Sequence, residues 1–256
     1  VPPRRRVDDD RAIEVLMLGG GGWRGAFGSI GTVAYLRSRG LWAGVHHVVG
    51  LSGGSFVAGV LGAEGVDDDD PSPVLAGLAR RMMRLRVPMY GAAALAVAPA
   101  MASTVAVAWW APGWWLLAAP TLALYVGRWT ISACWRRMLR SLFGRAAPRS
   151  GGSRRYVVCA TGRSSARPHF FVAGGPDDTG GPDRSGADEP WGRVVHGDWD
   201  WTDAVVSSTA LPWVNGYRTT ADPTLGDAGR AERLIDGGVV GIFGRQWFEP
   251  SLLGTT

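Results

Sequence analysis

The chain has 256 residues, of which 46% are hydrophobic and 19% are charged, and this balance excludes an intrinsically disordered protein. All 27 basic residues are arginine, so lysine-dependent phosphate loops and Schiff-base catalysis are excluded as well. The net charge of +5 suits anionic lipid headgroups or nucleic acid. Because no nucleic-acid-binding signature is present, we expect no nucleic-acid partner.

The cysteines and histidines do not indicate a metal site. Two cysteines in apolar surroundings are too few for a disulfide framework, so we expect buried free thiols. The four histidines lack metal-ligand spacing, and the adjacent pair is expected to lie in a strand and point to opposite faces. We therefore predict no metal ligands among Cys134, Cys159, His46, His47, His169 and His196.

The first 65 residues alternate between strand and helix patterns. Residues 1–11 form a polar tail that we expect to be disordered, and no apolar segment typical of a secretory signal follows directly, so an intracellular protein is expected. The β-turn-α-β-turn-α pattern is typical of a parallel sheet covered by helices. Its predicted elements are a buried strand over 12–18, a helix over 25–39 ended by Gly40, a strand over 45–49 and a helix that opens over 55–61.

Residues 87–127 carry no charged side chain. Residues 89–108 are about as long as a bilayer core is thick, and 109–115 (WWAPGWW) resembles a hairpin tip with aromatic side chains at a membrane interface. Since arginines flank both outer ends, both ends are expected on the cytoplasmic side. A hairpin that spans, re-enters or only lies on the membrane is compatible with the pattern. So is a soluble protein whose apolar helices cover the sheet or dimerise.

The second half of the chain is less regular. An acidic loop over 65–72 precedes the uncharged segment, and a polar, low-complexity loop over 174–190 is expected to be flexible. No internal repeat is present. The other predicted elements are strands over 156–160, 170–172 and 233–236, and a helix over 201–211 closed by Pro212.

Gly50-Leu51-Ser52-Gly53-Gly54 fits the G-x-S-x-G pattern of a nucleophilic serine. The predicted strand before it and helix after it are the context that this chemistry requires, because a tight turn lifts the hydroxyl above the sheet edge. Ser55 does not have glycine at both flanking positions and would fall inside the helix. We therefore prefer Ser52 as the nucleophile over a turn without chemical function.

Gly19 to Gly25 (GGGGWRG) lies at a second strand-to-helix junction. Exposed backbone N–H groups there can bind an oxyanion or a phosphate. The run also satisfies G-x-G-x-x-G, which predicts a dinucleotide site only if an acidic residue follows about 20 residues later. No Asp or Glu occurs between Glu14 and Glu64, so this nucleotide interpretation is the weaker one.

Asp236 is the best candidate for a base. It ends the predicted strand over 233–236, where a parallel sheet places functional groups, and two glycines follow it. A simple Asp-Gly turn is the alternative. No histidine follows Asp236, so the chain order of a hydrolase triad is not met.

The ordered set GGGGWRG, GLSGG and DGG resembles the patatin-like phospholipase family. The likeness extends to Val205–Tyr217 (VVSSTALPWVNGY) and to the strand from Tyr156, and covers about 12–65 and 156–240. The resemblance implies a three-layer α/β/α fold with a mainly parallel central sheet, here with an inserted apolar helical hairpin. The expected domains are thus the tail, a catalytic domain over 12–256 and the insertion.

The resemblance also implies a Ser-Asp dyad without a metal or cofactor. Ser52 would be the nucleophile, Asp236 its partner, and Arg24 the basic position of the glycine loop. The expected activity is lipid acyl hydrolysis at the cytoplasmic side of a membrane, with a phospholipid or another acyl lipid as substrate. A catalytically inactive membrane-associated protein of the same fold is the alternative. The oxyanion donors implied are Gly20, Gly21 and Gly22, and the supporting motif glycines are Gly25, Gly50, Gly53, Gly54, Gly237 and Gly238.

Overall fold

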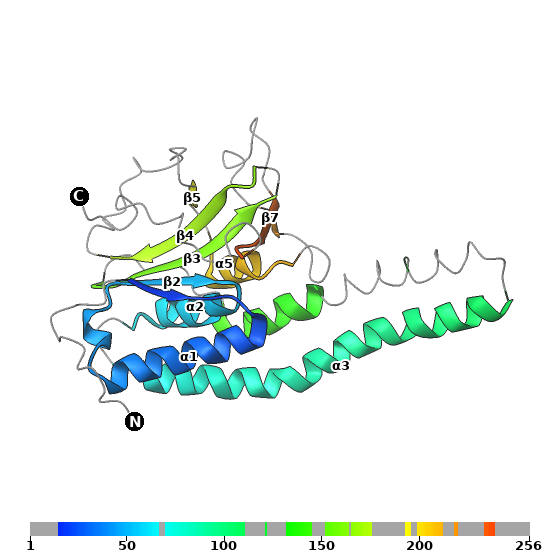
Figure 1. Cartoon of the computed structure of the whole chain (residues 1–256), viewed down its shortest axis with the longest axis horizontal. Coiled ribbons are helices and arrows are strands. Elements are labelled where there is room, and N and C mark those ends of the chain that lie inside the picture. Colours follow the sequence, from blue (N-terminus) through cyan, green and yellow to red (C-terminus); the bar gives the residue numbers. More distant parts are fainter. Residues whose placement is uncertain are drawn as a thin grey trace, which may run out of the picture.

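A computed structural model describes residues 15–66, 70–110, 121, 132–144, 152–163, 165–175, 193–195, 199–211, 218–219 and 233–238 (Figure 1). The predicted tail, most of the loop over 174–190 and the predicted hairpin tip lie outside these residues. The elements are β1 (Val15–Leu18), α1 (Gly22–Ser38), η1 (Trp42–Gly44), β2 (His47–Leu51), η2 (Ser52–Gly54), α2 (Ser55–Glu64), α3 (Ser72–Trp110), β3 (Arg155–Gly162), β4 (Pro168–Gly174), β5 (Arg193–Val195), α5 (Trp201–Ser208), β6 (Arg218–Thr219) and β7 (Arg233–Asp236). A further helical segment covers 132–143.

One mixed sheet contains every described strand. Strands β1, β2 and β3 are neighbours in this order and run parallel, with Leu18 opposite Gly50 and Leu51 opposite Cys159. Strands β4 and β7 both pair antiparallel with β3, and β5 pairs parallel with β4. The expected α/β class and parallel centre of the sheet are confirmed, and the parallel strands end at one edge because helices return the chain between them.

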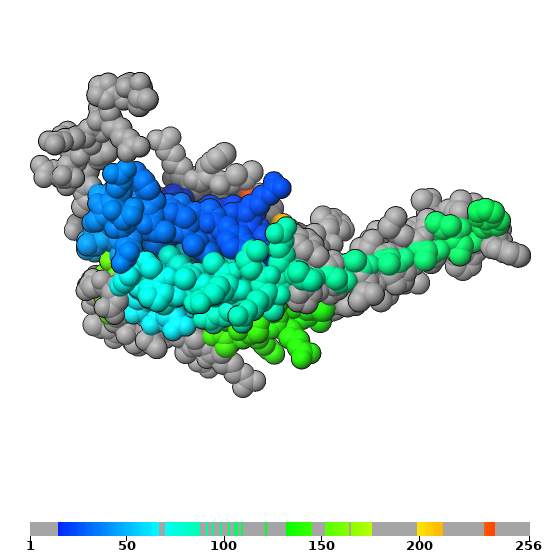
Figure 2. All heavy atoms as spheres, turned by 90° about the horizontal axis from the view of Figure 1, so that it is seen from below, coloured from blue at the N-terminus to red at the C-terminus, as the bar shows by residue number. Residues whose placement is uncertain are grey.

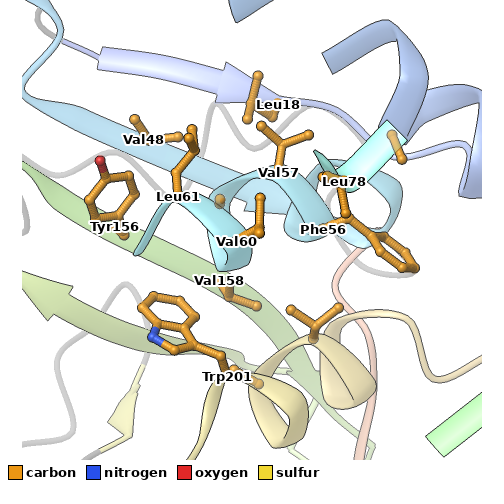
Figure 3. Packing of buried hydrophobic residues seen from close by; sticks show 14 of the residues in the cluster. Leu18, Val48, Phe56, Val57, Val60, Leu61, Leu78, Tyr156, Val158 and Trp201 are labelled. Atoms are coloured by element: carbon orange, nitrogen blue, oxygen red, sulfur yellow. The ribbon is translucent and has the colours of Figure 1, made fainter. Parts of the chain in front are cut away.

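The described helices all pack on one face of the sheet. Alternate residues of β3 point to opposite faces, so Tyr156 and Val158 join the large core cluster while Val157 and Cys159 join a smaller cluster of strand residues. Helix α2 packs on β2 and β3 beside α5 and is buried along nearly its whole length (Figure 3). Among the described residues one helical layer is therefore present, and the second helical layer stays a prediction.

Several element boundaries differ from the sequence-based expectations. Helix α1 begins at Gly22 rather than Gly25, since Gly21 adopts a left-handed conformation that turns the chain directly into the helix. Helix α5 ends at Ser208 rather than at 211, because the next carbonyl groups accept hydrogen bonds from the end of β7. Strand β2 starts at His47, so His46 and His47 do not share a strand.

Helix α3 extends far beyond the body of the molecule (Figure 1, Figure 2). Its first half packs on the body through Leu75, Leu78 and Met82, whereas Val87 is already 76% exposed. The sequence-based interpretation recognised the uncharged segment but not that one helix begins at Ser72. Within the described residues, no helix meets the length and hydropathy needed to cross a membrane.

Gly62→Ala should lower the free energy of unfolding by about 1–3 kcal/mol, because core overpacking costs this much. The new Cβ would overlap the fully buried Trp201 ring and approach Tyr156 Cβ at 3.1 Å. Gly28→Ala in α1 is the matched control. No atom lies within 4 Å of its new Cβ, so we expect about 0.5–1 kcal/mol of added stability. Urea denaturation followed by tryptophan fluorescence measures both, and equal stabilities would contradict the packing of α2 on α5.

Candidate active site

Ser52 lies in a strained turn between β2 and α2. It is one of two described residues other than glycine with a positive φ, at 47°. Such a conformation is costly for a side chain that bears a Cβ and is typical of the strand-turn-helix that presents a nucleophile. The glycines around it allow close contact with neighbouring backbone. A Cβ on Gly53 would collide with the backbone of Gly22, and one on Gly54 with that of Leu18.

Asp236 reaches the serine from the other end of the sequence. Ser52 Oγ donates a hydrogen bond of 2.6 Å to Asp236 Oδ2. Strand β7 positions the carboxylate by pairing Asp236 with Ala160 of β3, next to the strand that carries the serine. The second carboxylate oxygen accepts 2.7 Å from the N–H of Gly238, so both oxygens are held. The structure therefore brings the two predicted dyad residues into hydrogen-bond reach.

Burial changes the acidity of this carboxyl group. Asp236 is only 4% exposed, and this desolvation raises its pKa above the ordinary value. The hydrogen bonds from Ser52 and Gly238 act in the opposite direction and favour the ionised form, but they do not outweigh burial. A carboxylate with a raised pKa is a stronger base, which suits a group that must take a proton from a serine hydroxyl.

The pH dependence of turnover should report this shift. Protonated Asp236 cannot accept the serine proton, so kcat/KM is expected to fall as the pH drops through the raised pKa, above the ordinary value of about 3.9. A pH profile with a soluble ester, taken only over the range in which circular dichroism shows a folded protein, measures this limb. An acid limb at or below the ordinary aspartate pKa would contradict the assignment of Asp236 as the base.

The glycine loop lies directly beside the serine. A Cβ on Gly20 would approach Ser52 Cβ at 3.4 Å, while Gly21 and Gly22 both have positive φ values of 112° and 57°. Helix α1 starts at Gly22, and no side chain caps its first turn. The start of α1 therefore combines N–H groups without intrahelical partners and a positive helix end near the serine, as anion binding requires.

Arg24 and the other motif residues are placed around the same junction. Arg24 lies in the first turn of α1 and is exposed. The remaining predicted motif glycines allow close backbone approach: Gly25 to Gly20, Gly50 to Ser55, and Gly237 to Cys159. The N–H of Gly238 donates to the Asp236 carboxylate. All the predicted site residues therefore lie at the junction of β1, β2 and β7 with their following turns.

The end of α5 was missed as a part of this site. Ser208 Oγ accepts a hydrogen bond of 3.0 Å from the N–H of Ser52, and the Ser208 carbonyl accepts from the N–H of Gly237. The Ala210 carbonyl accepts from the N–H of Asp236 at 2.9 Å. One short segment thus holds both the serine turn and the aspartate turn. The run of small polar residues in VVSSTALPW marks this segment in the sequence, but it does not indicate which residues the segment would contact.

Neither cysteine contacts Ser52 or Asp236 in a described hydrogen bond, and the same holds for His169. Cys159 is fully buried, and burial raises its pKa, which keeps the thiol protonated. Cys134 is only half-buried, contrary to the expectation, because the segment over 132–143 lies at the margin of the core. His169 is buried in β4, with Nδ1 at 3.1 Å from the carbonyl oxygen of Arg167. Within the described part of the chain, no group of three or more His, Cys, Asp or Glu side chains could hold a metal ion.

The comparisons with known proteins leave the function to be argued from this geometry. No protein-family model and no curated protein matches the chain. Its fold is similar to the crystal structure of VipD from Legionella pneumophila, with a TM-score of 0.41 and 12% identity. The match covers 90% of this chain and 46% of VipD, so the chain spans about half the length of that protein.

Proposed function

We propose that the protein is a serine hydrolase that cleaves acyl esters of lipids with a Ser52–Asp236 dyad. The observation that carries the proposal is the 2.6 Å hydrogen bond from Ser52 Oγ to a buried carboxylate, made by a serine in a strained turn. The motif order that resembles patatin-like phospholipases supports a lipid as the acyl donor. No cofactor or metal is needed for this chemistry.

In the proposed reaction, Ser52 Oγ attacks the ester carbonyl carbon while Asp236 accepts its proton. The carbonyl oxygen becomes an oxyanion next to Gly20, Gly21 and Gly22, where each N–H donor contributes roughly 3 kcal/mol to transition-state stabilisation. The C–O bond to the alcohol then breaks, and the alcohol takes the proton back from Asp236. An acyl-serine remains.

Water completes the cycle. Asp236 takes a proton from a water molecule that attacks the acyl-serine, and the second tetrahedral intermediate releases the fatty acid as Ser52 recovers its proton. Ser208 Oγ accepts from the Ser52 N–H, and the Gly238 N–H donates to the Asp236 carboxylate, so each contact holds one partner of the dyad through both steps. This alignment supports direct transfer without a histidine between them.

Release of fatty acid from phospholipid vesicles tests the proposal. The wild-type protein should release fatty acid and lysophospholipid in equal amounts at first, detected by mass spectrometry. The matched control is the Ser52→Ala protein, which should release neither. Equal release by both proteins, or release by neither, would contradict the proposed function.

A further inference from the structure

The charges of the chain are strongly segregated. Residues 71–176 contain 14 of the 27 arginines and none of the 22 acidic residues, so this stretch is basic and the remainder is acidic. Its described parts include α3, the helical segment over 132–143 and strands β3 and β4. Where its arginines are exposed, such a stretch attracts anionic partners over about 10 Å at moderate salt.

The distal part of α3 forms an apolar arm, defined here as 87–110. It carries no charged side chain, and at 1.5 Å per residue it is about 36 Å long. Val105 and Trp109 are 63% and 82% exposed, so the distal part of the arm leaves large apolar side chains uncovered. The arm positions whose exposure the structure describes are all exposed, and none carries a charge: Val87, Gly91, Ala94, Ala98, Ala102, Val105, Ala106 and Trp109.

Exposed arginines lie on both helical elements that meet where the arm leaves the body. Arg84 lies on α3 just before the arm, and Arg137 and Arg140 lie on the helical segment over 132–143 that returns beside it. Arg81 joins the two elements by donating 3.2 Å to the carbonyl of Leu142. Guanidinium groups bind phosphate with paired hydrogen bonds, so this collar suits lipid phosphates at the depth where the arm begins.

The arm and the candidate active site lie at the same end of the molecule. The carboxyl ends of β1 and β2 point toward the end from which α3 projects (Figure 1). Trp135, at the base of the arm, packs edge-to-face against Trp23 and Phe56 and donates a hydrogen bond of 3.0 Å to Thr209 Oγ1. These contacts connect the base of the arm to the glycine loop, the serine helix and the segment that holds the dyad.

We propose that the arm and its arginine collar (Arg84, Arg137 and Arg140) dock the protein on an anionic lipid bilayer. The uncharged arm enters the interfacial and acyl region, and the arginines pair with lipid phosphates. Docking in this way turns the dyad toward the lipid surface. The view that these lipids are also the substrate rests on the proposed hydrolase function. A second copy of the chain fits this surface less well than a bilayer does. In a symmetric dimer through this surface, arginines would face arginines, and no acidic residue of 71–176 would pair with them.

Vesicle flotation tests the docking surface without any reference to catalysis. The wild-type protein should float with vesicles of phosphatidylcholine and phosphatidylglycerol and should stay at the bottom with phosphatidylcholine alone. Arg84→Gln/Arg140→Gln should weaken binding about 25-fold, because each arginine near such a surface contributes about fivefold. The matched control is Arg37→Gln/Arg39→Gln at the far end of α1, which removes the same charge and should weaken binding less than about threefold.

A second variant tests the apolar part. Val105→Asp places a charge on an exposed position, so the fold should be kept while vesicle binding falls at least about tenfold. Equal flotation on both vesicle types, or unchanged flotation of both test variants, would overturn the proposal. Loss of a dimer by light scattering without a change in flotation would assign the arm to self-association instead. Ser52→Ala should float like the wild type, so failed catalysis with intact flotation rejects only the hydrolase proposal.

Discussion

Ser52→Ala is expected to reduce turnover of a soluble nitrophenyl ester by at least about 1,000-fold, with a KM that changes little. Removal of a nucleophile abolishes the covalent route and leaves only the residual effect of binding and oxyanion donors. The loss of one hydroxyl hydrogen bond leaves the strained turn in place, because Ser208 still binds the Ser52 N–H. Initial rates over a range of ester concentrations measure the effect.

The control for this substitution is Ser38→Ala at the far end of α1. Ser38 is exposed and donates only to the Tyr35 carbonyl, so its removal should leave turnover within about twofold and stability within about 0.5 kcal/mol. Circular dichroism of both variants shows whether the fold is kept. If folded Ser52→Ala retained the wild-type rate, the nucleophile would have to be another residue.

Asp236→Asn is expected to lower kcat by about 100- to 10,000-fold, the usual contribution of a positioned base. The amide keeps the shape of the carboxylate and its oxygen can still accept from the Gly238 N–H, but its nitrogen cannot take the Ser52 proton. Exposed Asp70, which pairs with Arg37, provides the matched control, since Asp70→Asn should leave kcat unchanged.

The same substitution should not destabilise the fold at neutral pH. The folded-state pKa of Asp236 lies above the unfolded value, so its stabilising contribution is present below the unfolded pKa and is lost as the pH rises through the folded pKa. At pH 7 the buried carboxylate is therefore unfavourable, and the neutral amide removes that cost. Urea denaturation at pH 7 should give an unchanged or higher free energy of unfolding. A clearly lower value would mean that Asp236 holds the fold rather than serving chemistry.

The sequence was sufficient to propose Ser52 and Asp236 as partners because the signals at both residues are local. Ser52 is recognised by the glycines within two positions of it, and Asp236 by the glycines that follow it and by its strand. Strand β7 has the predicted bounds for the same reason, since a short apolar run between polar segments leaves little choice. Fold class followed from the order of strands and helices in the first 65 residues.

Contacts between segments that are distant in the sequence could not be predicted from such local signals. The pairing of β4 and β7 with β3 depends on how distant segments meet, and hydrophobic periodicity does not report strand direction. Ser208 is 156 positions away from the serine whose N–H it binds, so no spacing rule could assign it. The length of α3 was missed because its charged first half and uncharged second half differ in composition although they form one helix.

Fluorophosphonate labelling followed by peptide mass spectrometry tests the central claim most directly. The reagent bonds covalently to a serine only when a base and an oxyanion site activate it. A single adduct on Ser52 in the wild type, weakened in Asp236→Asn and absent in Ser52→Ala, is the predicted result. A folded wild-type protein that carries no adduct, or carries it on another serine, would contradict the Ser52–Asp236 dyad.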